Sequence, residues 1–126
     1  MTAQIKAHIR VQGARQVEQL DEAALLQAAE SALRRALERT ADDARSRCPV
    51  DTGELRRSIG VHIARSDKGV TGAVYASAPY AKAVELGTLK SRAQPFLYPA
   101  YRENAAQIKS ALQMQLRRAL KGEDEA

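Results

Sequence analysis

The side chains that could carry out catalysis are few and are not grouped. The histidines are His8 and His62, and each occupies a polar position in a segment where apolar and polar residues alternate. Such positions face solvent in a half-buried strand, so exposure explains both residues without a site role. One cysteine and two separated histidines also fall short of a metal-ligand signature. We therefore expect no metal site and no cofactor.

Cys48 and Ser58 are the candidate nucleophiles, and neither comes with an activating base. Cys48 follows a long helical pattern, and the C-terminal end of a helix dipole raises the pKa of a thiol. We interpret Cys48 as a small buried side chain beneath the turn at Pro49. A hydrolase that uses Ser58 and Glu85 is the weakest alternative, because no histidine is placed beside either residue. The sequence thus predicts a protein without catalytic activity.

The sequence predicts two long helices, which must position any functional side chains. The first begins near Asp21, which can cap its start, and ends at or before Cys48, since Pro49 cannot continue it. Apolar residues recur in it at every third or fourth position and form one stripe. The second follows Pro99, which suits a first helical turn, and its apolar stripe continues to Leu120.

Alternation with a period of two predicts strands. It extends over residues 5–11, up to Gly13, and returns at residues 59–63 and 70–76, around turn residues at 66–69. The fold class is therefore α+β, with long N-terminal and C-terminal helices packed on a small antiparallel β-sheet made of an N-terminal strand and a hairpin. Residues 51–54 resemble a capping box with Asp51 at its first position, which predicts a short helical turn that continues through Arg57. A second short helix is expected over residues 80–86, and a loop over residues 88–94.

Length and composition agree with one soluble domain over residues 1–126, with residues 121–126 as a frayed tail. The net charge is +5, from 20 basic and 15 acidic side chains, but no run of Lys and Arg exceeds two residues. A DNA-binding protein usually concentrates its positive charge on one face. A small basic nucleic-acid-binding module is therefore the alternative function, and nucleic acid is not the expected partner. No segment is long and apolar enough for a signal peptide or a membrane span, so no membrane partner is expected.

Two turn segments hold the most distinctive residues. The first, residues 48–59, reads C-P-V-D-T-G-E-L-R-R-S-I. The second, residues 80–88, reads Y-A-K-A-V-E-L-G-T, and residues 93–100 follow with A-Q-P-F-L-Y-P-A. In this order, and between two long helices, these blocks resemble the tail-completion, or minor tail component, family of lambda-like long-tailed bacteriophages. The resemblance covers about residues 5–120, with Cys48, Leu86 and Tyr98 where the family commonly has Ala, an aromatic residue and Arg.

The resemblance implies a structural morphogenesis protein that joins heads to tails, located in the virion's tail or neck and present in the host cytoplasm during assembly. It also implies a ring around the tail axis. The expected partners are further copies of the chain, the head connector, and the tail terminator or tube proteins.

The residues of these blocks divide into a structural and an exposed group. The structural group is expected to shape turns and helix ends: Asp51 and Thr52 as acceptors for free amides, Gly53 to relieve crowding, Gly87 as a left-handed helix cap, and Pro95, Phe96 and Pro99 to anchor the loop's return. The exposed group has no evident folding role and forms the candidate protein interface: Glu85, Thr88, Lys90, Arg92 and Gln94. In a ring, Arg92 of one copy could reach Glu85 of the next. The alternative is that Glu85 caps amides of its own loop and that the cations are merely solvated.

Overall fold

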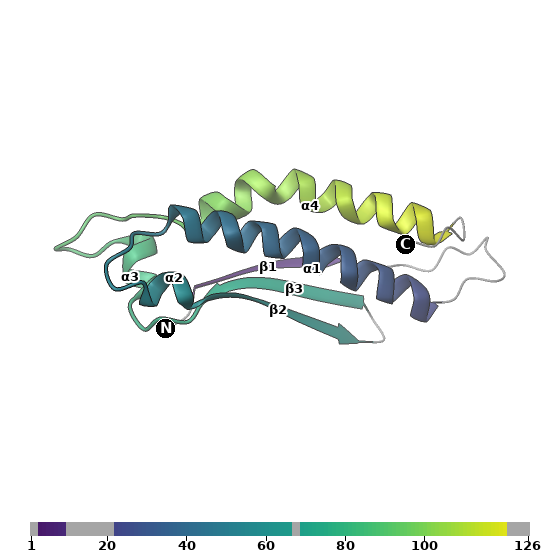
Figure 1. Ribbon diagram of the computed structural model, residues 1–126, viewed down its shortest axis with the longest axis horizontal. Coiled ribbons are helices and arrows are strands. Elements are labelled where there is room, and N and C mark those ends of the chain that lie inside the picture. The colour runs from purple at the N-terminus through teal and green to yellow at the C-terminus, as the bar shows by residue number, and fades with distance from the viewer. Residues whose placement is uncertain (1–2, 10–21, 67–68, 121–126) are drawn as a thin grey trace.

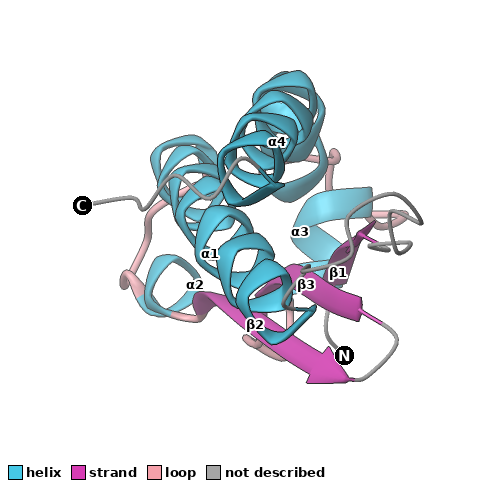
Figure 2. Cartoon of the chain, turned by 90° about the vertical axis from the view of Figure 1, so that its right-hand side faces the viewer, coloured by secondary structure: helices cyan, strands magenta, loops and turns pink. Residues whose placement is uncertain are grey.

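The computed structural model describes residues 3–9, 22–66 and 69–120, and it confirms the predicted α+β fold (Figure 1). Two long helices, α1 (Glu22–Arg47) and α4 (Leu97–Leu120), lie against a three-stranded antiparallel sheet. Helix α1 packs on the sheet, and α4 packs chiefly along α1 (Figure 2). The short helices α2 (Glu54–Arg57) and α3 (Ala81–Leu86) lie at one end of the elongated molecule.

The sheet has β3 (Gly69–Ala76) at its centre, between β1 (Ala3–Ile9) and β2 (Ile59–Ser66). Strands β2 and β3 form the predicted hairpin, in a register that pairs Ile59 with Ala76. Strand β1 pairs antiparallel with the other edge of β3, in a register that pairs Ala3 with Ala76 and Ile9 with Val70. It includes Ala3 and Gln4, which precede the predicted alternation. The predictions for Val11, Gly13, the Asp21 cap, the residues at 67–68 and the 121–126 tail lie outside the described residues.

The core lies between α1, the hairpin and the start of α4. Leu33 and Leu37 of α1 are almost completely buried and face Gly72 of β3. A Cβ atom at Gly72 would lie 2.4 Å from Leu37 Cδ1 and 2.8 Å from Leu33 Cδ2. The glycine therefore allows α1 to approach the sheet as closely as its leucines require.

Polar contacts fix the end of α1 beside α4 and the hairpin. Asn104 of α4 donates from Nδ2 to Asp43 Oδ2 at 3.0 Å, and Arg47 Nε lies 2.9 Å from Asp43 Oδ1. Arg45 donates to the Ile59 carbonyl at 2.9 Å. Helix α1 then stops at Arg47, as the proline two residues later predicts. These contacts hold the chain where residues 48–58 begin.

The predicted capping of α2 is only partly right. Thr52 Oγ1 accepts the Glu54 amide at 3.3 Å, whereas the residue directly before the helix is Gly53 with φ +84°. Asp51 lies two residues before the capping position, which Gly53 occupies in a left-handed conformation. The helix ends at Arg57, as predicted, but it begins at Glu54 and not directly after Asp51.

Candidate protein-interaction site

Helices α2 and α3 lie at one end of the molecule (Figure 1). Most of the exposed large apolar side chains among the described residues belong to this end. We call this end, residues 49–58 together with 78–98, the tip. Six large hydrophobic side chains are exposed among the described residues, and all but Met114 of α4 belong to the tip: Val50, Tyr80, Leu86, Leu89 and Tyr98. Apolar side chains gathered at one end of a protein commonly mark a surface that binds another protein.

The loop over residues 88–94 is exposed, as predicted, and its own hydrogen bonds shape it. The Thr88 amide donates to the Ser91 carbonyl at 2.9 Å, and Thr88 Oγ1 accepts the amides of Lys90 and Ser91 at 3.2 and 3.1 Å. The Gln94 amide donates to the Val84 carbonyl at 2.8 Å and closes the base. Leu89 lies on this hydrogen-bonded turn and is fully exposed, at 108% relative accessibility.

Gly87 ends α3 and starts the loop, but its conformation differs from the prediction. Its φ of 78° is positive, as expected, while its ψ of 170° places it in an extended region rather than in the left-handed helical one. This region is essentially restricted to glycine. A Cβ atom here would lie 2.7 Å from the Ala93 nitrogen, so the two arms of the loop approach each other only because residue 87 has no side chain. The extended ψ sends the loop away from α3 instead of curling it back.

Glu85 has a structural role, close to the alternative in which it caps amides of its own loop. Its side chain is only 9% exposed, and its carboxylate accepts the amides of Phe96 and Leu97 through Oε1 at 3.1 and 2.9 Å and that of Tyr98 through Oε2 at 3.2 Å. The expectation that Glu85 has no folding role is therefore wrong. Glu85 caps α4 from a different helix, because free amides at a helix N-terminus need acceptors and favour negative charge.

A signal for this cap was present in the sequence. The residues just before α4 are Gln94, Pro95 and Phe96, and none of them is a favoured capping residue. The acceptor had to come from elsewhere in the chain. Because both carboxylate oxygens already accept amides of its own chain, Glu85 is poorly placed to accept a hydrogen bond from Arg92 of another copy.

The other predicted interface residues do share the tip surface. Thr88, Lys90, Arg92 and Gln94 are all exposed, and their interface role remains a prediction. The predicted anchor is confirmed, because Phe96 is completely buried. Pro99 falls in the first turn of α4, as expected, although the helix begins two residues before it.

A cleft of about 310 Å³ opens in the tip between the start of α2 and one side of α3. Tyr80 on its wall donates to Glu54 Oε2 at 3.3 Å. Partial burial and the Glu54 carboxylate both raise the pKa of the Tyr80 hydroxyl, so it remains a donor. Apolar side chains and two carboxylates, those of Asp51 and Glu54, contribute to the lining of the cleft. The lining residues are Pro49, Val50, Asp51, Thr52, Gly53, Glu54, Leu55, Tyr80 and Val84.

Comparison with protein families identifies the family of this chain. The family described as "Bacteriophage HK97-gp10, putative tail-component" matches residues 12–87, more than half of the chain. The chain belongs to this phage tail-component family. No curated protein and no solved structure matches it. The matched region includes α1, the hairpin, the P-V-D-T-G-E-L-R block and α3, and it ends at Gly87, before the loop.

A tail component is a structural part of the virion, and the candidate nucleophiles of this one have structural surroundings. Cys48 is 5% exposed and donates from Sγ to the Arg45 carbonyl at 3.3 Å, which agrees with the predicted buried filler. Ser58 donates from Oγ to the Leu55 carbonyl at 2.7 Å and closes the end of α2. His62 is exposed on β2, whereas the side chain of His8 lies outside the described part of the structure.

The part of the chain that the structure describes contains neither a cluster of metal ligands nor a helix that could span a membrane. No three His, Cys, Asp or Glu side chains there lie close enough together to hold a metal ion. None of the described helices has both the length and the apolar character that crossing a membrane requires.

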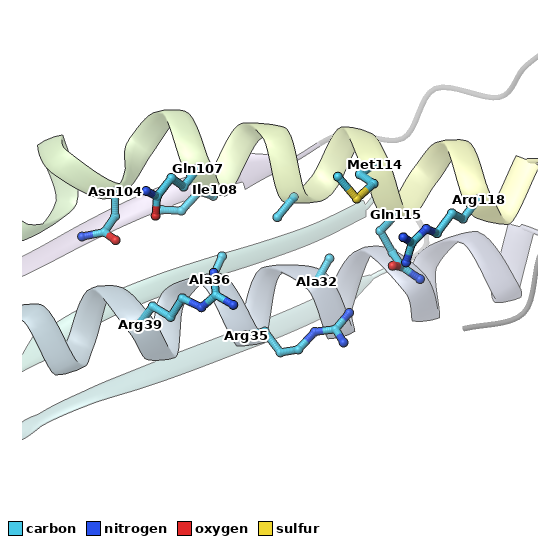
Figure 3. A pocket seen from close by; sticks show the side chains of 11 residues that line it. Ala32, Arg35, Ala36, Arg39, Asn104, Gln107, Ile108, Met114, Gln115 and Arg118 are labelled. Carbon is cyan, nitrogen blue, oxygen red and sulfur yellow. The ribbon is translucent and has the colours of Figure 1, made fainter. Parts of the chain in front are cut away.

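The tail component has a second hollow, away from the tip, between α1 and α4. Figure 3 shows Arg35 and Arg39 of α1 and Arg118 of α4 beside this groove of about 190 Å³. Ala32 and Ile108 contribute apolar lining. The groove is thus basic, and no aromatic side chain lines it.

Proposed function

We propose that this tail component is a tail-completion protein of the head–tail junction, which assembles into a ring around the tail axis through its tip. Its partners are further copies of the chain, the head connector, and the tail terminator or tube proteins. It is present in the host cytoplasm until it enters the neck of the virion. The observation that carries the proposal is the fully exposed Leu89 on a hydrogen-bonded turn, within an end where four more large apolar side chains are exposed.

The energetics of the tip favour association over folding. A fully exposed leucine adds nothing to the stability of its own chain, while burying it against a partner contributes about 1.5–3 kcal/mol. The hydrogen bonds of Thr88 already fix the turn, so little conformational entropy is lost when a partner binds. A preformed apolar knob is suited to weak contacts that repeat around a ring.

Complementation of a phage that lacks this gene tests the proposal. Leu89→Ser and Leu86→Ser should together lower the titre at least about tenfold, since the loss of about 1.4 kcal/mol per contact already changes an equilibrium tenfold. Electron micrographs should show separate heads and tails. Met114→Ser is the matched control, because Met114 is also exposed but lies outside the tip. A wild-type titre from the double variant, with the protein folded, would refute the role of the tip.

The basic groove between α1 and α4 favours the alternative function, binding of nucleic acid. Phosphate contacts by Arg35, Arg39 and Arg118 would release counterions, so DNA affinity would fall steeply with salt concentration. Single-strand binding also uses aromatic stacking, and the groove has no aromatic lining. Fluorescence anisotropy with a labelled duplex over a salt series separates the two functions. If the logarithm of the DNA affinity falls steeply with the logarithm of the salt concentration, and Arg39→Ala reduces that slope, nucleic-acid binding is favoured. Absence of DNA binding would favour the junction role.

A further inference from the structure

We propose that Leu89 of one copy inserts into the tip cleft of a second copy of this chain, so that the loop and the P-V-D-T-G-E-L turn are two halves of one repeated contact. This inference rests on the proposed ring and names the surfaces that join its subunits. It also gives the two distinctive segments of the sequence a common purpose.

The size and lining of the cleft suit the side chain. Its volume of about 310 Å³ exceeds the roughly 150 Å³ of a cavity that holds benzene, so a branched aliphatic side chain has room. Pro49, Leu55 and Val84 provide apolar walls. Val50, at the same cleft, is 61% exposed and would be covered by the incoming loop. The contact would thus bury apolar surface on both copies.

The charges around the two surfaces are complementary. Lys90 and Arg92 flank the turn that carries Leu89, and both are exposed. Asp51 and Glu54 line the cleft and are also exposed. Cations that accompany an apolar knob toward a cleft with two carboxylates gain favourable interactions on approach. The neighbouring basic residue Arg57 is not part of the lining, and its guanidinium donates to the Thr52 carbonyl at 3.4 Å.

The groove between α1 and α4 is a poorer receptor for the same loop. Its rim carries Arg35, Arg39 and Arg118, as Figure 3 shows, whereas the cleft carries carboxylates. Bringing Lys90 and Arg92 to that rim would place like charges together, which suppresses association. Its volume is also smaller, at about 190 Å³.

The type of contact agrees with a ring. The loop and the cleft are different surfaces of the same tip, and when each copy uses its loop on one neighbour and its cleft on another, the contact is heterologous and repeats from copy to copy until it closes. A reciprocal exchange between two copies would instead stop at a dimer. The two arrangements therefore differ in the size of the covalent products that a cross-link across the contact would give.

Paired cysteines in assembled particles test the contact. Leu89→Cys and Val50→Cys are introduced together in a Cys48→Ala background, the deletion phage is complemented, and purified particles are oxidised. A non-reducing gel should show a ladder of covalent oligomers beyond the dimer. Leu89→Cys with Met114→Cys is the matched control, since Met114 lines the groove, and it should stay monomeric on the gel.

Charge exchange gives an independent measurement that needs no cross-link. Arg92→Glu should lower the titre at least about tenfold, and adding Asp51→Arg should recover most of it, because the swap restores the opposite charges. No recovery, or a wild-type titre for Arg92→Glu, would overturn the contact.

The gel outcomes separate this inference from the proposed function. Joined particles that contain the cysteine pair but give no ladder would overturn the contact and leave the junction role standing. A product that stops at the dimer would overturn the ring arrangement, and a ladder from the Met114 pair would place the loop in the groove. Absence of the protein from joined particles would refute both proposals.

Discussion

The body of the molecule and its tip use apolar side chains in opposite ways. In the body, Leu33, Leu37 and Val74 are at most 1% exposed and hold α1 on the hairpin. At the tip, Leu86 is 66% exposed and Leu89 is completely exposed. Burial in the body stabilises the chain, whereas exposure at the tip leaves free energy available for binding other proteins. The difference separates residues that maintain the fold from residues that act on partners.

The tip also has its own internal supports, and besides the buried Phe96 these include polar contacts and a glycine. Glu85 holds the start of α4, Thr88 holds the turn, and Gly87 permits the close approach of the loop's arms. The exposed leucines are therefore presented by a rigid frame. Variants of the body, of the frame and of the presented residues should affect stability to decreasing degrees.

The largest loss of stability is expected in the body, for Leu37→Ala. Leu37 is 1% exposed and packs against β3, so truncation removes buried surface and leaves a cavity that costs about 2–4 kcal/mol. Denaturant unfolding measures the change. Leu89→Ala is the control and should stay within about 0.5 kcal/mol of the wild type. An unchanged midpoint for Leu37→Ala would mean that the body does not depend on the α1 leucines.

The next largest loss is expected in the frame, for Glu85→Ala. Three amides at the start of α4 would lose a charged acceptor, at a cost of about 1.5–3 kcal/mol. Glu38→Ala, on the exposed face of α1, controls for the loss of a surface carboxylate. Thermal unfolding distinguishes the two variants. Equal melting temperatures would return Glu85 to the group of surface residues and weaken the distinction between frame and presented side chains.

A smaller or similar loss is expected for Gly87→Ala. An alanine would have to adopt φ and ψ values that are essentially restricted to glycine, and its Cβ would lie 2.7 Å from the Ala93 nitrogen. The strain should cost about 1–3 kcal/mol or be relieved by moving the loop. Unfolding midpoints measure the first outcome, and reduced joining of heads to tails measures the second. A variant that is normal in both would show that the loop's geometry is not constrained by residue 87.

The same comparison shows what could be predicted from the sequence. Helices and strands of the body follow from local periodicity, and the stripe ending before Pro49 placed α1 to within a residue or two. The role of Glu85 could not be found in this way, because its partners lie 11 to 13 residues further along the chain, beyond an irregular loop. The cleft depends on where the turn before α2 and one side of α3 lie relative to each other, and local periodicity does not determine that arrangement. The geometry of the candidate site is therefore determined by tertiary contacts of irregular segments, which local sequence patterns do not predict.

The last prediction concerns Cys48, which lies at the border between the body and the tip. Burial raises the pKa of its thiol, with the nearby Arg56 charge opposing the effect. At a given pH the native protein therefore has less of the reactive thiolate than the unfolded chain has. Ellman's reagent should label native Cys48 at least about tenfold more slowly than the protein in denaturant, which corresponds to an opening free energy of about 1.4 kcal/mol.

The pH dependence of this reaction has a defined sign. Because the folded-state pKa is raised, the contribution of the neutral thiol to stability is present below the ordinary thiol pKa and is lost as pH rises through the folded value. Native labelling should therefore accelerate at a higher pH than labelling of the denatured chain. Substitution of a tip residue such as Leu89 should leave the native rate unchanged, since Cys48 packs within the core cluster. Rapid native labelling near neutral pH would place Cys48 with the exposed tip and move the boundary between the two regions into the end of α1.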